Sequence, residues 1–153
     1  MLPFVLTVEL VPLVAHTNKR AVAFLKGHKN LTASIAFEAV ADGPVGKRLK
    51  HRMTLWIEFK PDTKGKFHRF KNMDEKYKDC FVFIDIDAQM RLYGFSCHPR
   101  PRMEGFELIV LTDYEQKKED HTNLAALERV LKWKDDPATQ DALLTLYQNT
   151  EQP

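Results

Sequence analysis

Three cations near the ends of two predicted strands have side chains suited to binding a phosphate. Arg91 lies in one alternating apolar run, and Lys117 and Lys118 follow the next run along the chain. If the two runs are antiparallel neighbours, these cations converge at one end of the sheet, where they could stabilise a phosphate. A structural alternative is that Arg91 pairs with Asp85 or Asp87 and that the two lysines only solvate a strand end.

The chain lacks the motifs of the common nucleotide-binding and hydrolytic folds. It contains no glycine-rich phosphate loop, no G-x-G-x-x-G, no G-x-S-x-G and no paired C-x-x-C, and its six histidines show no H-x-x-x-H spacing. Cys80, Cys97 and His98 have no evident fourth zinc ligand, so packing explains them better than a metal site. Asp85 and Asp87 are better explained as an exposed strand end than as an acid pair. We expect no metal and no cofactor.

Positive charge is concentrated in the middle of the chain. Residues 45–78 contain 11 Lys and Arg against 4 Asp and Glu, a net charge of +7, whereas residues 79–153 contain 8 against 14, a net charge of −6. Such a division is typical of a protein that binds a polyanion through one surface. A disordered, solvated loop is the alternative, but the aromatic residues Trp56, Phe59, Phe67 and Phe70 favour an ordered surface. The residues expected to contact the polyanion are Lys47, Arg48, Lys50, Arg52, Lys66 and Arg69.

Length and composition predict one globular domain over residues 1–153. Hydrophobic residues make up 44% of the chain and charged residues 29%, and two cysteines are too few for a disulfide framework. The apolar first fifteen residues lack a basic segment and contain Glu9, which favours a strand over a signal peptide. No run approaches the roughly 18 apolar residues that span a bilayer. We expect a cytoplasmic protein with no membrane partner.

The first half of the chain has alternating strand and helix patterns. Residues 4–11 predict a strand, and residues 19–26 and 31–41 predict two short helices that form a helical hairpin. Residues 52–60 alternate between apolar and polar side chains, which predicts a half-buried strand. The polar residues 61–79 predict a loop.

The second half predicts three strands and then two helices. Strands are expected over residues 80–87, 90–97 and 106–112, and helices over residues 122–133 and 137–147. Strands grouped after a helical hairpin are typical of an antiparallel sheet rather than of a parallel one.

These elements predict an α+β fold. An N-terminal strand and helical hairpin would be followed by an antiparallel meander sheet and C-terminal helices. In that arrangement Val82, Ile84 and Ile86 share one hydrophobic core with the 31–41 helix.

From about Phe81 to Trp133 the chain resembles the RelE/HigB-type toxins of bacterial toxin–antitoxin systems. The segments that carry the resemblance are MRLYGF at 90–95, FELIVLTDYEQKK at 106–118 and TNLAALERVLKW at 122–133. Members of that family typically have a strand with an arginine step. An aliphatic strand follows, ending in an aromatic residue, a Lys-Lys pair and a threonine, and an amphipathic helix comes next. The resemblance covers roughly a third of the chain and implies a RelE-like order of β-α-α-β-β-β.

The family positions are occupied residue by residue, but the chain departs from the family at the Glu-Leu-Arg step and in the stretches 60–79 and 97–105, which resemble insertions. The matching residues are Arg91, Tyr114, Lys117, Lys118 and Thr122. The family's Glu-Leu-Arg step stands here as Ile84-Asp85-Ile86, without the arginine.

The resemblance implies metal-independent cleavage of RNA. A ribose 2′-hydroxyl attacks the adjacent phosphate, fixed cations stabilise the extra negative charge, and other side chains transfer protons. By this resemblance the charge stabilisers are Arg91 and Lys117 or Lys118. The candidate proton carriers are Tyr114, His98 and His121.

The function that the resemblance implies is that of a toxin-like mRNA endoribonuclease. It would depend on the ribosome, and a cognate antitoxin protein would neutralise it. One alternative is a non-enzymatic binding or inhibitor protein that uses the basic segment 45–78. Another is a toxin of the same fold that targets gyrase.

Overall fold

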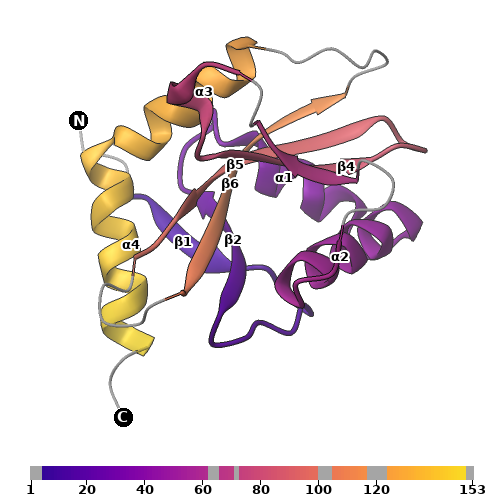
Figure 1. The fold of residues 1–153 in the computed structure, drawn as a ribbon, viewed down its shortest axis with the longest axis horizontal. Coiled ribbons are helices and arrows are strands. Elements are labelled where there is room, and N and C mark those ends of the chain that lie inside the picture. Colours follow the sequence, from indigo (N-terminus) through magenta and orange to yellow (C-terminus); the bar gives the residue numbers. More distant parts are fainter. Residues whose placement is uncertain (1–4, 62–65, 71–72, 100–104, 117–123, 151–153) are drawn as a thin grey trace.

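A six-stranded mixed sheet lies between two pairs of helices in the computed structural model, which describes residues 5–61, 66–70, 73–99, 105–116 and 124–150 (Figure 1). The strands are β1 (Thr7–Leu10), β2 (Arg20–Lys26), β3 (Phe67–Arg69), β4 (Cys80–Asp85), β5 (Met90–Cys97) and β6 (Glu107–Gln116). The helices are α1 (Thr32–Val40), α2 (Pro44–Ile57), α3 (Leu124–Asp135) and α4 (Pro137–Thr150), with a short 3₁₀ turn, η1 (Glu75–Tyr77). The strand order is β1-β2-β6-β5-β4-β3. Strands β2 and β6 are parallel, and the other neighbouring pairs are antiparallel.

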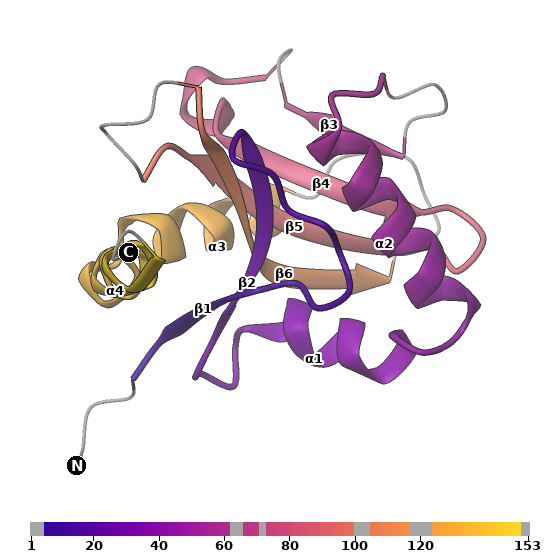
Figure 2. The same ribbon diagram turned by 90° about the horizontal axis from the view of Figure 1, so that it is seen from below.

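Each face of the sheet has its own hydrophobic core. Helices α1 and α2 cover one face, and α3 and α4 cover the other (Figure 2). Strand β4 contributes to both cores, because Phe81 and Phe83 belong to the α1/α2 core, whereas Val82 and Ile84 belong to the α3/α4 core. A strand covered on both faces has no polar side to alternate with its apolar one.

The predicted helix at residues 19–26 is wrong, because this segment forms strand β2. Residues Ala21 to Leu25 are all buried, some in one core and some in the other. A short, continuous apolar run fits a central strand as well as a buried helix, so periodicity could not distinguish them. Thr17 makes a turn before the strand rather than a helix cap, since its hydroxyl accepts hydrogen bonds from the N–H groups of Lys19 and Arg20.

The predicted strand at residues 52–60 is also wrong, because its first six residues belong to helix α2. Pro44 occupies the first turn of that helix, where proline is favoured. Leu49, Met53 and Trp56 face the sheet at helical spacing. The helical hairpin therefore consists of α1 and α2, one element later than predicted.

The predicted antiparallel meander sheet is only partly correct. Strands β4, β5 and β6 do form an antiparallel meander, but β2 joins β6 in parallel, so the sheet is mixed. The element order β1-β2-α1-α2-β3-β4-β5-β6 also differs from the expected β-α-α-β-β-β layout, because residues 20–26 form a second strand and β3 is added at one edge of the sheet. Residues 67–69 of the predicted loop form β3.

The expected common core of the 31–41 helix with Val82, Ile84 and Ile86 is wrong. Phe37 of α1 packs in the α1/α2 core, whereas Val82 and Ile84 lie across the sheet, and Ile86 is exposed. The sequence correctly predicted the α+β class and the positions of α1, β4, β5, β6, α3 and α4 to within a few residues. Within the described part of the chain, no helix combines the length and apolar character needed to cross a membrane.

Candidate functional site

A β-bulge shapes the end of the sheet that contains Arg91. The pairing of β5 with β6 shifts register between Tyr93 and Gly94. Gly94 lies so close to β6 that a Cβ atom added there would be 2.1 Å from the carbonyl oxygen of Val110. No larger residue fits this approach without a shift of the backbone, so Gly94 maintains the bulge. Beyond the bulge, Arg91 pairs with Glu115 of β6.

Arg91, Tyr93 and Glu115 form a group that we call the Arg91 cluster. The phenol of Tyr93 donates a hydrogen bond to Oε1 of Glu115 at 3.3 Å. The side chain of Arg91 hydrogen-bonds to the same phenol. Tyr93 is buried, whereas Arg91 and Glu115 are half-buried. The phenol therefore holds a cation and a carboxylate side by side, both partly accessible from solvent.

The electrostatics of the Arg91 cluster favour a protonated phenol. Burial, and then the charge of Glu115, raise the pKa of Tyr93, while Arg91 opposes the shift. At neutral pH the phenol thus remains a hydrogen-bond donor. Glu115 is a group that can accept a proton, and Arg91 is a group that can stabilise a developing negative charge. Tyr93 is only 1% exposed, so its place is to position these two side chains.

The other predicted catalytic residues do not join this cluster in the described structure. Tyr114 pairs with Leu92 and packs against the α1/α2 core, so it projects from the opposite face of the sheet. His98 follows the far end of β5, about 23 Å from Arg91 along the strand. Its Nδ1 lies 2.8 Å from the carbonyl oxygen of Phe106. The remaining predicted catalytic residues, Lys117, Lys118 and His121, lie outside the described residues.

Two members of the Arg91 cluster were missed at the sequence level. Tyr93 stands two residues after Arg91, and the two-residue period of a strand places both on one face. That spacing could have identified Tyr93. Glu115 could have been found only with the register of β5 against β6, because it lies opposite Arg91 on another strand.

Arg48, Arg52 and Asp85 form a second group, the Asp85 cluster, between α2 and β4. Arg48 donates two hydrogen bonds of 2.9 Å to the Asp85 carboxylate, and Nη1 of Arg52 donates another at 2.6 Å. Burial alone would raise the pKa of Asp85, but the hydrogen bonds and charges of the two arginines lower it. Asp85 therefore binds α2 rather than Arg91. The prediction that Asp85 and Asp87 form an exposed strand end is wrong for Asp85, which is buried, whereas Asp87 is exposed and lies 3.9 Å from Arg48.

Arg20, Arg69, Ser96 and Glu107 form a third group, the Glu107 cluster, at the opposite end of the sheet. Arg69 and Ser96 both donate hydrogen bonds to Oε2 of Glu107, and Nη2 of Arg20 lies 3.7 Å from Oε1. Burial would raise the pKa of Glu107, but these hydrogen bonds and the two positive charges lower it. The carboxylate thus has partners on both of its oxygens.

The six predicted RNA-binding residues are divided by these contacts. Arg48 and Arg52 bind Asp85, and Arg69 binds Glu107. Lys47 is exposed on α2, Lys50 is partly exposed on the same helix, and Lys66 is partly exposed before β3. Helix α2 contains four Lys and Arg and no carboxylate, so its outer surface stays basic after the Asp85 cluster has formed.

The cysteines and histidines do not form a metal site in the described part of the chain. No three His, Cys, Asp or Glu side chains among these residues are grouped so that they could hold a metal ion. Burial raises the pKa of Cys80 and of Cys97 to about 12. Both thiols are therefore protonated at neutral pH, which makes them poor nucleophiles and poor metal ligands.

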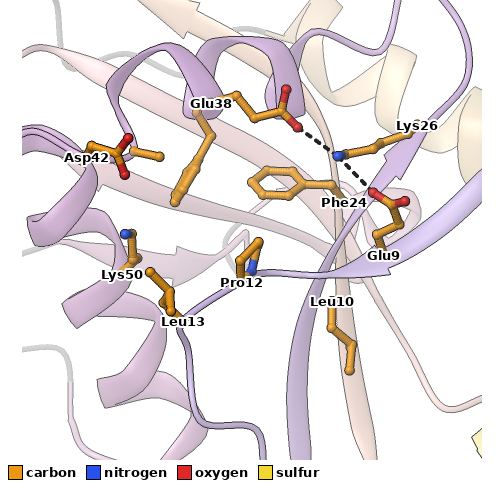
Figure 3. Close-up of a pocket in the computed structure, with 11 residues that line it drawn as sticks. Glu9, Leu10, Pro12, Leu13, Phe24, Lys26, Glu38, Asp42 and Lys50 are labelled. Carbon is orange, nitrogen blue, oxygen red and sulfur yellow. Dashed lines mark hydrogen bonds and ion pairs between the residues drawn. The ribbon is translucent and has the colours of Figure 1, made fainter.

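A groove of about 230 Å³ lies between α1 and the β1–β2 hairpin (Figure 3). Its apolar lining includes Phe24 and Phe37, and its rim carries Lys26, which binds Glu9 at 2.8 Å and Glu38 at 2.7 Å. The rim charges named here pair with one another. Among the described residues, none of the predicted catalytic residues lines the groove, and Lys50 is the one predicted RNA-binding residue in its lining.

Comparisons of the chain with protein-family models, with curated proteins and with solved structures found no match.

Proposed function

We propose that the chain is a toxin-like endoribonuclease that cleaves mRNA on the ribosome without a metal ion and that a cognate antitoxin neutralises. The Arg91 cluster carries this proposal. It joins a partly accessible cation to a partly accessible carboxylate through the phenol of Tyr93. These are the groups that attack by a 2′-hydroxyl requires, one to accept its proton and one to stabilise the charged phosphorane.

Within this proposal Glu115 accepts the proton of the 2′-hydroxyl, and Arg91 stabilises the negative charge on the phosphorus oxygens. Gln116 pairs with Met90, and Lys117 and Lys118 follow Gln116 directly in the sequence. The two lysines are therefore our candidates for a second charge stabiliser and for proton transfer to the leaving 5′-oxygen.

The basic surface of α2 supports RNA as the substrate. Helix α2 begins near the end of the sheet that contains the Arg91 cluster, because Arg48 in its first turns binds Asp85, and Asp85 pairs with Met90. Lys47 and Lys50 extend this basic surface along the helix. Phosphates held there would bring the RNA to the end of the sheet that contains Arg91. Because α2 covers the face opposite to the Arg91 cluster, the RNA strand would pass around this end of the sheet to reach Arg91.

The test is to express the protein and its variants in a bacterial host, follow growth, and map cleavage sites in cellular mRNA by primer extension. Arg91→Ala should relieve growth arrest and lower the cleavage rate about a hundredfold, since such a charge typically contributes about 3 kcal/mol in the transition state. Lys118→Ala should act in the same direction but less strongly. Lys132→Ala, an exposed lysine of α3, is the matched control and should behave like the unchanged chain.

The thermal midpoint distinguishes a catalytic from a structural role. It should be nearly unchanged in Arg91→Ala. A large fall would mean that Arg91 mainly holds Tyr93 and Glu115 in place. If the unchanged chain arrests growth without cutting RNA, the gyrase-targeting alternative is favoured instead.

A second candidate function is non-enzymatic binding through the basic segment 45–78. The absence of carboxylates from α2 favours it. Salt-dependent RNA binding by a chain that neither arrests growth nor cuts RNA would support this function and exclude the enzyme.

A further inference from the structure

Phe59 occupies a backbone conformation in which glycine is normally found. It follows α2 directly and has a φ of 61°. The N–H of Phe59 donates to the carbonyl of Trp56 at 3.0 Å, and the N–H of Lys60 donates to the carbonyl of Leu55 at 2.8 Å. This pair of hydrogen bonds closes a helix end, and its left-handed position strongly favours glycine. A phenylalanine there is therefore conformationally strained.

The ring of Phe59 lies against a fixed cation. The guanidinium carbon of Arg20 is 3.8 Å from the centre of this ring and 4.4 Å from the centre of the Trp56 ring. Nη1 of Arg20 donates to the carbonyl of Trp56 at 2.7 Å, and Glu107 lies on the other side. Arg20 is thus fixed by several contacts, and its guanidinium packs against the ring of Phe59.

Unlike its neighbour, the Phe59 ring is largely open to solvent. Phe59 is 57% exposed, whereas Trp56 is 3% exposed. Lys19 precedes Arg20 in the sequence and Lys60 follows Phe59, and both lysines are exposed. Glu58, which precedes Phe59, is an exposed carboxylate. An exposed aromatic ring with basic neighbours offers a stacking surface for a base and cations for the phosphates next to it.

We propose that the Phe59 ring, supported by Arg20, is a stacking platform for an unpaired base of single-stranded RNA. Helix α2 connects this platform to the Arg91 end of the sheet over about 21 Å. Lys47 and Lys50 lie along that path, so one strand of RNA could contact the platform and the basic helix together. The inference rests on the proposed function in that RNA is the ligand, but it does not require cleavage.

The test is equilibrium binding of the full chain to a labelled eight-nucleotide single-stranded RNA. Phe59→Leu and Phe59→Gly should weaken binding about five- to 150-fold, the range typical of one stacked base, and Phe59→Trp should retain affinity. Leu144→Ala is the matched control, because Leu144 is a large apolar residue with the same exposure on α4 and should not contribute. An RNA with abasic sites should lose the difference between the unchanged chain and Phe59→Leu.

The thermal midpoint distinguishes a stacking platform from a purely structural role, in which Phe59 only covers the Glu107 cluster. Phe59→Gly relieves the left-handed strain, so its thermal midpoint should be equal to or above that of the unchanged chain while its RNA affinity falls. A lower midpoint with unchanged RNA affinity would overturn the platform and show that Phe59 has only a structural role. Failure of the unchanged chain to bind RNA would overturn both proposals. Loss of cleavage in Arg91→Ala with normal binding and an inert Phe59→Leu would overturn the platform alone.

Discussion

Glu107 and Glu115 lie at opposite ends of strand β6, and the two carboxylates differ in how far they are exposed to solvent. Glu107 is buried and receives hydrogen bonds from Arg69 and Ser96, with Arg20 near its other oxygen. Glu115 is half-buried and accepts a long hydrogen bond from the phenol of Tyr93, and Arg91 beside it hydrogen-bonds to that same phenol. The first carboxylate is enclosed by the fold, and the second is held where a ligand can approach it.

The comparison shows that an arginine near a carboxylate is not by itself an active site. A buried carboxylate with partners on both oxygens is costly to disrupt and has no capacity left for a substrate. The same holds for Asp85, which is fully buried between Arg48 and Arg52. Partial exposure, rather than residue type, distinguishes the Arg91 cluster from these two.

The most direct test of this comparison is to remove one charge at each end of β6. Glu107→Gln should lower the free energy of unfolding by about 3 kcal/mol, because it leaves two arginines near a neutral group in a largely buried site. Glu115→Gln should lower it by less than about 1 kcal/mol, since partly exposed pairs contribute little. Urea denaturation of both variants measures the difference. Equal losses would show that the two ends do not differ as the structure indicates.

A smaller effect is expected from the glycine that maintains the bulge beside the Arg91 cluster. Gly94→Ala should lower the free energy of unfolding by about 2 kcal/mol, because the new Cβ would meet the carbonyl of Val110. Gly105→Ala is the control: its φ is 82° but no atom lies within 4 Å of the added Cβ, so about 1 kcal/mol of backbone strain is expected. If Gly94→Ala also lowers RNA cleavage while the protein remains folded, the bulge positions Arg91. A Gly94→Ala variant as stable as Gly105→Ala would contradict the close approach.

The sequence predicted the second half of the fold well because its patterns are unambiguous there. Strands β4 to β6 are bounded by polar or proline-rich segments, and Pro137 marks the first turn of α4. The errors at β2 and α2 share one cause. Ala21 to Leu25 are buried on both faces, which hides any period, and Met53 to Phe59 alternate by coincidence on a helix whose buried residues recur at helical spacing.

The site could be predicted only in part. The sequence singled out Arg91 as a candidate, and its catalytic role stays a prediction. Its partner Glu115 depends on the register of two strands, which no local pattern reveals. The structural roles of Arg48, Arg52 and Arg69 depend on carboxylates 33 to 38 residues away in the chain. A charge count over residues 45–78 cannot separate cations that stabilise the fold from cations that face solvent.

Acid should weaken the Glu107 end of the sheet. Because the folded-state pKa of Glu107 is lowered, its contribution to stability is complete above its unfolded pKa of about 4.3 and is lost as pH falls through the lower folded value. Each unit of lowering corresponds to about 1.4 kcal/mol. The difference in unfolding free energy between the unchanged chain and Glu107→Gln should therefore be constant from pH 7 to 5 and shrink below pH 4. Urea midpoints across this range measure it, and a difference that does not shrink would contradict the lowered pKa.

The smallest change in stability is expected for the lysines of helix α2 that face solvent, in contrast to the buried Arg52 of the same helix. For single-stranded RNA, the slope of log affinity against log salt concentration falls by about 0.7 for each phosphate contact that is lost. Lys47→Ala with Lys50→Ala should thus flatten the slope by about 1.4, while stability changes by no more than about 0.5 kcal/mol because both side chains reach solvent.

Arg52→Ala is the contrasting variant to the double lysine substitution. It removes a buried partner of Asp85, so it should destabilise the protein by several kcal/mol and leave the salt slope of the folded fraction unchanged. Arg48, whose side chain is about one-third exposed, should fall between the two. Binding that ignores salt, or that survives the double lysine substitution with its slope intact, would exclude α2 as the RNA surface. A flattened slope in Arg52→Ala would show instead that the Asp85 cluster opens when RNA binds, and that its cations serve the ligand after all.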